Sequence, residues 1–190
     1  FVIVLNQIFI LEETVLIERL KNEKTQDFAF RYLVDLYKKK LYWHIRKIVI
    51  VHDDADDVLQ NTFLKVFKGI QHFNGDSKIY SWMYRIATNE AINFLNQKAR
   101  MMSTSLEEIQ YKLVEKLPED PYFDGDAMQL KLQKAIVSLP QKQQLVFNMR
   151  YFDEVKYEDM SHILETSEGA LKASYHLARK KIESYLINEK

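Results

Sequence analysis

The chain has 190 residues, of which 47% are hydrophobic, and its 27 basic side chains are balanced by 27 acidic ones. It contains no cysteine, which excludes disulfides and thiolate metal sites. Only four glycines and three prolines are present, too few for a fold rich in tight turns, so we expect long helices in one large or two small domains.

The charge is unevenly distributed along the chain. Residues 101–130 carry two basic and seven acidic side chains, whereas the segments on both sides have a small basic excess. Basic ends suit contact with nucleic acid, but on charge alone ordinary solvated surfaces are an equally good interpretation.

The opening run Phe1–Leu11 is apolar. It is shorter than the roughly 20 residues of a membrane span and lacks the basic leader of a signal peptide. We expect a packed strand or the start of a helix, or sequence upstream of the functional domain.

Helical periodicity starts near residue 25. Phe28, Tyr32 and Leu36 recur at four-residue spacing and predict one apolar stripe on a helix for which Thr25 is a suitable N-cap. A second helix is predicted over Leu41–Val51.

The acidic run 52–57 predicts the start of a third helix, because carboxylates cap the N-terminus and favour its positive end. Its predicted apolar face contains Leu59, Phe63, Val66 and Ile70. A loop over Gln71–Lys78, with Gly75, separates it from a long helix at about Tyr80–Lys98.

The long helix has an unusual polar face. Arg85, Asn89, Asn96 and Arg100 fall near one side of it, with Trp82 one turn earlier, although Asn is a poor helix former. Aromatic, guanidinium and amide groups on one face suit single-stranded DNA, since they stack on bases, hold phosphates and read base edges. The loop 73–79 could form the wall of a base pocket. The alternative, that Trp82 and Ile86 are core and the Asn residues are incidental, is favoured slightly on this pattern alone.

Residues 99–125 lose this periodicity and are acidic, with Pro118 and Pro121. They predict a linker with a short helix near Leu106–Leu113. The expected organisation is a first domain over residues 1–98, a linker over 99–127 and a second domain over 128–190.

The C-terminal pattern indicates a helix-turn-helix. Tyr157–Leu164 is a short amphipathic helix, residues 165–169 form a turn, and a second helix covers Gly169–Leu186. The apolar stripe of the second helix consists of Leu171, Tyr175, Ala178, Ile182 and Tyr185, and its opposite, basic side of Lys172, His176, Arg179 and Lys180. Such a second helix fits the major groove, although a helical hairpin with a solvated basic face would have the same pattern.

Three segments together resemble the extracytoplasmic-function (ECF) group of bacterial RNA polymerase sigma factors. They are Asp54–Lys65, His72–Ala91 and the tail, which begins at Ser138–Phe147 and continues through Tyr157–Met160 and Ser167–Lys172. The resemblance implies an all-α fold of two small helical domains joined by a linker. It also implies a cytoplasmic protein without enzymatic activity, cofactor, metal or direct membrane insertion.

The resemblance further implies partners and residue roles. The partners are core RNA polymerase, through its β′ clamp helices and β flap, promoter DNA and an anti-sigma factor. The implied polymerase-binding residues are Asp56, Asp57, Gln60, Asn61 and Leu64. Those implied for the −10 element are Phe73, Asn74, Gly75, Ser77, Trp82, Arg85 and Asn89. Those implied for the −35 element are Gly169, Lys172, Ala173, His176, Arg179 and Lys180.

Some positions depart from the pattern of the group. Asn61 stands where Glu is frequent, Ser174 and Leu177 stand where Arg is frequent, and Ala170 replaces a usual Thr. We therefore expect weaker phosphate contacts at the −35 helix and an altered preference for its sequence.

Two other functions remain open from the residues. A helix-turn-helix regulator would bind duplex DNA without docking on polymerase. An enzyme could use His44, His52 and the nearby acids as a metal site, although helix capping explains those acids better. The acidic linker could also let the two basic domains pack together and mask each other.

Overall fold

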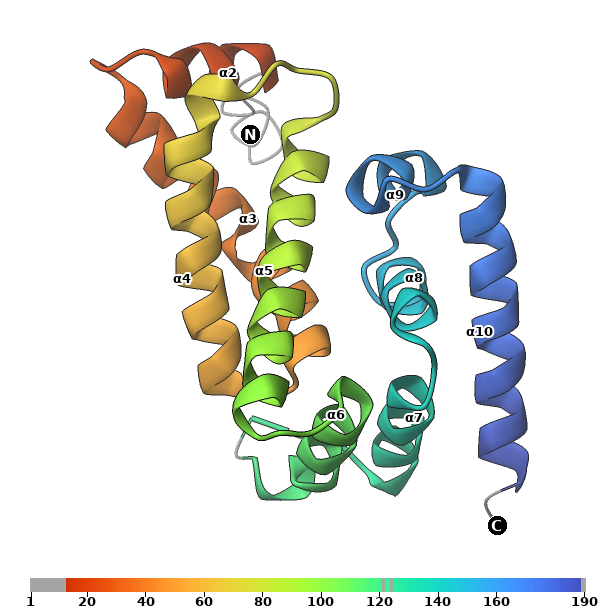
Figure 1. Cartoon of the computed structure of the whole chain (residues 1–190). Coiled ribbons are helices and arrows are strands. Elements are labelled where there is room, and N and C mark those ends of the chain that lie inside the picture. Colours follow the sequence, from red (N-terminus) through yellow and green to blue (C-terminus); the bar gives the residue numbers. More distant parts are fainter. Residues whose placement is uncertain (1–12, 121, 124, 189–190) are drawn as a thin grey trace, which may run out of the picture.

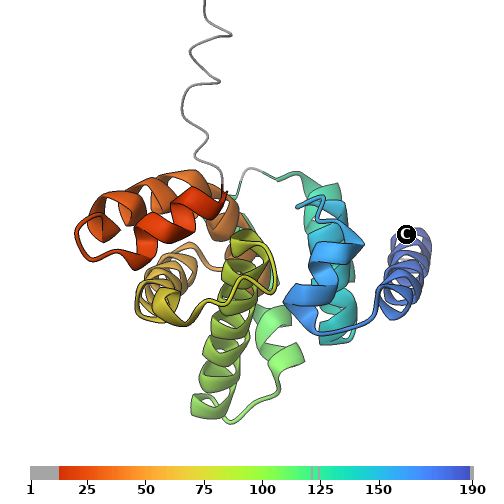
Figure 2. The ribbon, with the colours of Figure 1, turned by 90° about the horizontal axis from the view of Figure 1, so that it is seen from above.

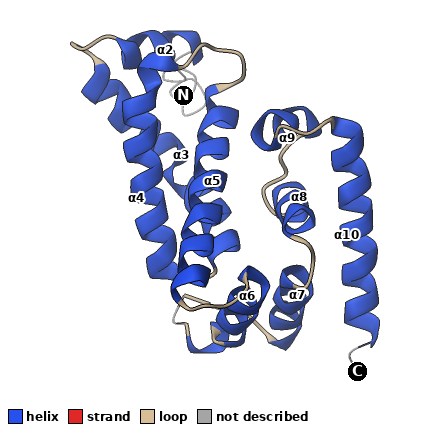
Figure 3. Ribbon diagram, viewed as in Figure 1, coloured by secondary structure: helices blue, strands red, loops and turns tan. Residues whose placement is uncertain are grey.

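The structure, a computed structural model, describes residues 13–120, 122–123 and 125–188. Within these ranges the regular secondary structure consists of nine α-helices and two short 3₁₀ helices, with no strand, as Figure 3 shows. The predicted all-α class is confirmed. The run Phe1–Leu11 lies outside the described residues.

The first half of the chain is a bundle of three long helices closed at one end by a short one (Figure 1). The helices are α2 (Glu13–Lys21), α3 (Gln26–Val49), α4 (His52–Gly69) and α5 (Ile79–Met101). Their apolar faces meet in a core that includes Leu33, Ile45, Val66, Met83 and Leu95. Burial of such side chains is the main source of stability for a helical domain.

The prediction of two separate helices over residues 26–51 was wrong, because α3 is continuous over 24 residues. No Gly or Pro interrupts it, and it ends only at Ile50, whose φ is 72°. The predicted apolar stripe was also wrong, since Phe28 is 69% exposed and Leu36 is exposed. The buried face is shifted by one position along the helix, to residues such as Ala29 and Leu33.

Capping at the starts of α3 and α4 also differs from expectation. Thr25 stands at the N-cap of α3, but its hydroxyl donates to the carbonyl of Arg19 (2.9 Å) and does not cap the helix. Helix α4 follows Val51 with no side-chain cap, while Asp53 and Asp54 lie in its first turn. The acids therefore act through the helix dipole and not through capping.

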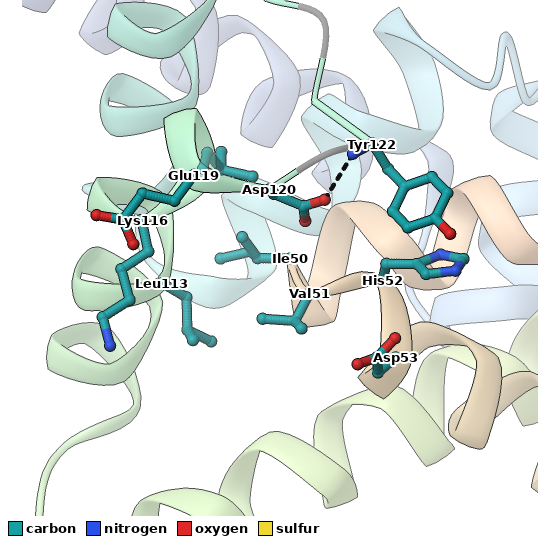
Figure 4. A pocket seen from close by; sticks show the side chains of 10 residues that line it. Ile50, Val51, His52, Asp53, Leu113, Lys116, Glu119, Asp120 and Tyr122 are labelled. Atoms are coloured by element: carbon teal, nitrogen blue, oxygen red, sulfur yellow. Dashed lines mark hydrogen bonds between the residues drawn. The ribbon is translucent and has the colours of Figure 1, made fainter.

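The segment predicted as a linker is packed against the bundle. It contains α6 (Leu106–Glu115), close to the predicted short helix, and the 3₁₀ helix η2 (Leu117–Glu119). Val114 and Leu117 form a small buried cluster with Ile50 and Val137. Arg46 donates to Asp120 (2.5 Å), and Figure 4 shows the Tyr122 ring facing His52, with ring centroids 3.8 Å apart.

The C-terminal part contains α7 (Ala127–Val137), α8 (Gln141–Tyr151), α9 (Tyr157–Leu164) and α10 (Glu168–Asn188). Helix α9 has the predicted bounds, and α10 extends the predicted second helix by one residue at its start and two at its end. The C-terminal core consists of Ala135, Ile136, Leu139, Phe147, Ala178 and Ile182. The buried stripe of α10 is therefore the predicted one, while the limits of the two predicted domains stay predictions.

The two halves of the molecule lie side by side, with α9 against α5 (Figures 1 and 2). One continuous hydrophobic cluster includes Met83 and Leu95 of α5 together with Met149 of α8 and Met160 and Ile163 of α9. The halves thus share a core.

Candidate nucleic-acid interface

A polar cleft of about 170 Å³ lies at the start of α5. Its lining residues are His72, Phe73, Asn74, Asp76, Ser77, Trp82, Arg85 and His162. The loop after α4 turns back onto α5 at Gly75, whose φ of 80° favours glycine. Five of the seven residues assigned to this surface from the sequence, those at positions 73, 74, 77, 82 and 85, are thereby brought together.

Trp82 is fixed in the wall of this cleft by its neighbours. Its ring lies 5.1 Å from that of Phe73, which is buried and therefore supports the indole. A Cβ at Gly69 would come within 3.2 Å of the indole, so glycine permits this close packing. The half-buried indole has the fixed orientation that base stacking requires.

Asn89 is exposed on α5 but lines a neighbouring groove of about 260 Å³. The opposite wall of this groove comes from α8 and from the turn after α9, including Gln141, Lys142 and Glu165. His162 of α9 completes the first cleft, and its lone position in the sequence gave no signal of this role.

Ion pairs join α9 to this face of α5. Arg85 Nη1 donates to Glu165 (2.9 Å), and Lys78 Nζ donates to the buried Asp159 (2.8 Å). The hydrogen bond and negative charge of Asp159 raise the pKa of the Lys78 amine. The surface formed by Trp82, Arg85 and Asn89 is therefore covered in part by the helix-turn-helix.

A buried polar cluster at Asp153 holds the loop between α8 and α9 to α3. Lys47 Nζ donates to Asp153 Oδ1 (2.5 Å), and His44 Nδ1 lies 3.1 Å from Oδ2. His44 Nε2 contacts the Thr88 hydroxyl (2.8 Å), which links the cluster to α5. Burial raises the pKa of the Asp153 carboxyl, but the hydrogen bond to His44 and the attraction to His44 and Lys47 outweigh it and hold this pKa below its usual value.

The outer face of α10 is basic and exposed, as predicted. Its exposed residues include Gly169, Lys172, Ala173, His176, Arg179 and Lys180. Lys172 pairs with Glu168 (3.1 Å) and Arg179 with Glu183 (3.0 Å). Both pairs are solvent-exposed and weak, so the cations can exchange them for phosphates.

One side of α4 carries four of the five residues assigned to polymerase docking. Asp57, Gln60, Asn61 and Leu64 are exposed there, and Leu64 is 57% exposed. Asp56 lies at the edge of this side, where its carboxylate is 3.5 Å from His52 Nε2. The candidate metal ligand His52 also hydrogen-bonds the Tyr42 hydroxyl (2.7 Å), so its ring has structural partners.

Comparison with known proteins identifies both halves. Residues 33–101 match the family described as Sigma-70 region 2, and residues 129–182 match Sigma-70, region 4. The chain is 30% identical over 183 residues to the ECF RNA polymerase sigma-E factors of Salmonella typhimurium and Escherichia coli, covering 92% of this chain and 94% of each relative. It is 28% identical to the ECF RNA polymerase sigma factor SigW of Bacillus subtilis, over 92% of this chain and 98% of that protein.

The chain belongs to the ECF group of RNA polymerase sigma factors. As a sigma factor it directs RNA polymerase in transcription initiation, and its family is not a class of enzymes. The region 2 match ends at the last residue of α5, and the region 4 match extends from α7 into α10, so α6 lies between the two.

Solved structures share the fold of this sigma factor. CnrH in complex with the cytosolic domain of CnrY has a TM-score of 0.69 at 17% identity, covering 94% of this chain and 99% of that chain. The sigma factor RpoE of Bartonella quintana, in complex with the anti-sigma factor NepR, has a TM-score of 0.64 at 20% identity, covering 85% and 98%. In the part of the chain that the structure describes, no helix has the length and apolar character needed to cross a membrane.

Proposed function

We propose that the cleft at the start of α5 captures an unpaired base of the −10 element. The observation that carries this assignment is the convergence of Trp82, Arg85, Asn74 and Ser77 on one polar cleft. The indole would stack on the base, the amide and hydroxyl would bond its edge, and Arg85 would hold a phosphate. Asn89 extends this surface by one turn of α5, while Gly75 shapes the loop and Phe73 supports the indole.

A test of this assignment compares DNA with an unpaired −10 segment and fully paired DNA of the same sequence. Holoenzyme containing Trp82→Ala should lose roughly 10-fold or more in affinity for the unpaired DNA, given ~1–3 kcal/mol for a stacked base. Equal affinities of the Trp82→Ala and unmodified proteins for the unpaired DNA would refute the assignment.

The exposed face of α10 is proposed to read the −35 element in the major groove. Lys172, Arg179 and Lys180 would hold phosphates, and His176 would reach a base edge. Gly169 and Ala173 would let the helix approach the groove closely, since they carry little or no side chain.

The exposed side of α4 is proposed to dock on the β′ clamp helices of core polymerase, with region 4 contacting the β flap. Support comes from the acidic and amide groups gathered around the exposed Leu64. Co-elution of the sigma factor with core polymerase in gel filtration tests this docking and separates it from the alternative of a regulator that acts without polymerase.

The packed arrangement is proposed to be a resting form. Sites at −10 and −35 are 25 base pairs apart, roughly 85 Å of B-form DNA at ~3.4 Å per pair. A compact chain of this length has a radius of gyration of about 16 Å, so the two halves must separate to reach both sites. We further propose that the protein acts in the cytoplasm and that an anti-sigma factor holds it in the packed form. Support comes from the structural relatives, since CnrH was solved in complex with the cytosolic domain of CnrY, and RpoE in complex with the anti-sigma factor NepR.

A further inference from the structure

A second cleft, of about 330 Å³, lies between α3, the segment after α6, α7 and the loop after α8. It shares no lining residue with the cleft proposed for the −10 base. Its lining residues include Trp43, Arg46, Lys47, Tyr122, Phe123 and Phe152. The volume is within the range of about 300–1,000 Å³ that is usual for sites of small organic ligands.

Three aromatic side chains of the lining are exposed. Trp43 is 47% exposed, Tyr122 is 61% exposed, and Phe152 is also exposed. These three side chains come from three different segments and line one cleft. The Tyr122 ring also lies against that of His52, which lines the neighbouring pocket drawn in Figure 4. Exposed aromatic surface gathered in a concave site is typical of a ligand pocket and not of a solvated surface.

The charged residues of the lining are both cations. Arg46 is 7% exposed, its Nη2 binds Asp120, and its Nη1 has no hydrogen-bond partner among the residues that the structure describes. Lys47 Nζ lies 5.6 Å from the centroid of the Phe152 ring. The carboxylates of Asp120 and Asp153, which pair with these cations, lie outside the lining. An anionic ligand in this cleft would therefore face two cations and no carboxylate of the lining.

We propose that this cleft binds a small planar aromatic carboxylate. Its ring lies among Trp43, Tyr122 and Phe152, and its carboxylate faces Arg46 and Lys47. Planar rings gain from edge and face contacts with aromatic walls, and a carboxylate gains charge-assisted hydrogen bonds from a guanidinium and an ammonium. Binding of this ligand requires neither DNA nor polymerase. An absence of ligand binding is therefore distinguishable from an absence of promoter binding by the surfaces proposed above.

The test is calorimetric titration of the full chain with 2-naphthoate and with its neutral analogue 2-naphthamide. We expect saturable binding of one 2-naphthoate, with 2-naphthamide at least about tenfold weaker because it lacks the charge. Trp43→Ala should lower the affinity for 2-naphthoate by about tenfold or more. Circular dichroism reports whether this variant keeps its helices. Tyr111→Ala removes an aromatic side chain of similar exposure on α6, outside the cleft, and should leave the affinity unchanged. No binding, equal affinity for the acid and the amide, or equal affinity of the folded Trp43→Ala variant would each overturn the proposal.

Discussion

Asp153 offers a direct test of what holds region 4 against region 2. Its side chain is 7% exposed and lies within hydrogen-bond distance of both His44 and Lys47 on α3. In Asp153→Asn the shape of the side chain is kept and the charge is lost, so the interaction with Lys47 weakens while a hydrogen bond to His44 can persist. Since a hydrogen bond to a charged group contributes ~1.5–3 kcal/mol, we expect a loss of about 2 kcal/mol, or roughly 30-fold in the equilibrium between packed and separated halves.

Small-angle scattering and urea unfolding measure this effect together. The unmodified protein should have a radius of gyration near 16 Å, and Asp153→Asn should have a larger one if the halves separate. In a double-mutant cycle, Asp153→Asn and Lys47→Met should show a coupling of about 1–2 kcal/mol. As a matched control, Lys112→Met breaks the exposed pair with Glu108 and should leave the stability nearly unchanged.

The stability of the packed form should depend on pH in a direction that follows from the lowered pKa of Asp153. Because the folded structure lowers the pKa of Asp153, its contribution to stability is present above the ordinary carboxyl value, near pH 4, and is lost as the pH falls through the lower folded value. The packed form should therefore expand below about pH 4, and the Asn variant should lack this part of the acid response. An unchanged radius for Asp153→Asn, together with a coupling below about 0.3 kcal/mol, would refute the role of this cluster.

Three further outcomes follow from the proposed surfaces. Arg179→Ala should weaken transcription from promoters that depend on the −35 element, by ~1–3 kcal/mol if the guanidinium contacts a base; unchanged transcription at all salt concentrations would exclude that contact. Leu64→Ala should lower the affinity for core polymerase at unchanged thermal stability, because the side chain is largely exposed; equal co-elution with core would count against docking through α4. Limited proteolysis should cut first within residues 99–127, and most readily after η2, whereas early cuts inside Tyr80–Lys98 would contradict the domain limits.

Local chemistry made several elements predictable. The bounds of α9, the buried stripe of α10 and the turn at Gly75 all depend on neighbours a few residues apart, because helical periodicity and the φ preference of glycine act at that range. The family was recognisable for a related reason, because the segments that carry the resemblance are short, continuous stretches of sequence. The residues assigned to α4 and α10 could thus be placed on exposed faces before the fold was known.

The error in the predicted apolar stripe of α3 came from the register of that helix. Phe28 and Leu36 suit a buried stripe by spacing, but α3 packs through Ala29 and Leu33 instead. Periodicity states which residues share a face, and only the helices packed against α3 decide which of two adjacent faces is buried.

The sequence by itself determined the all-α class, the exposed face of α10, the polar side of α5 and membership of the sigma family. Only the tertiary structure decided that region 4 packs on region 2, since the contact between Lys47 and Asp153 joins residues 106 positions apart. Such pairs have no local signature, because their geometry depends on how whole helices pack. The same packing brought His162 to the cleft of Trp82 and set exposed aromatic rings around Arg46.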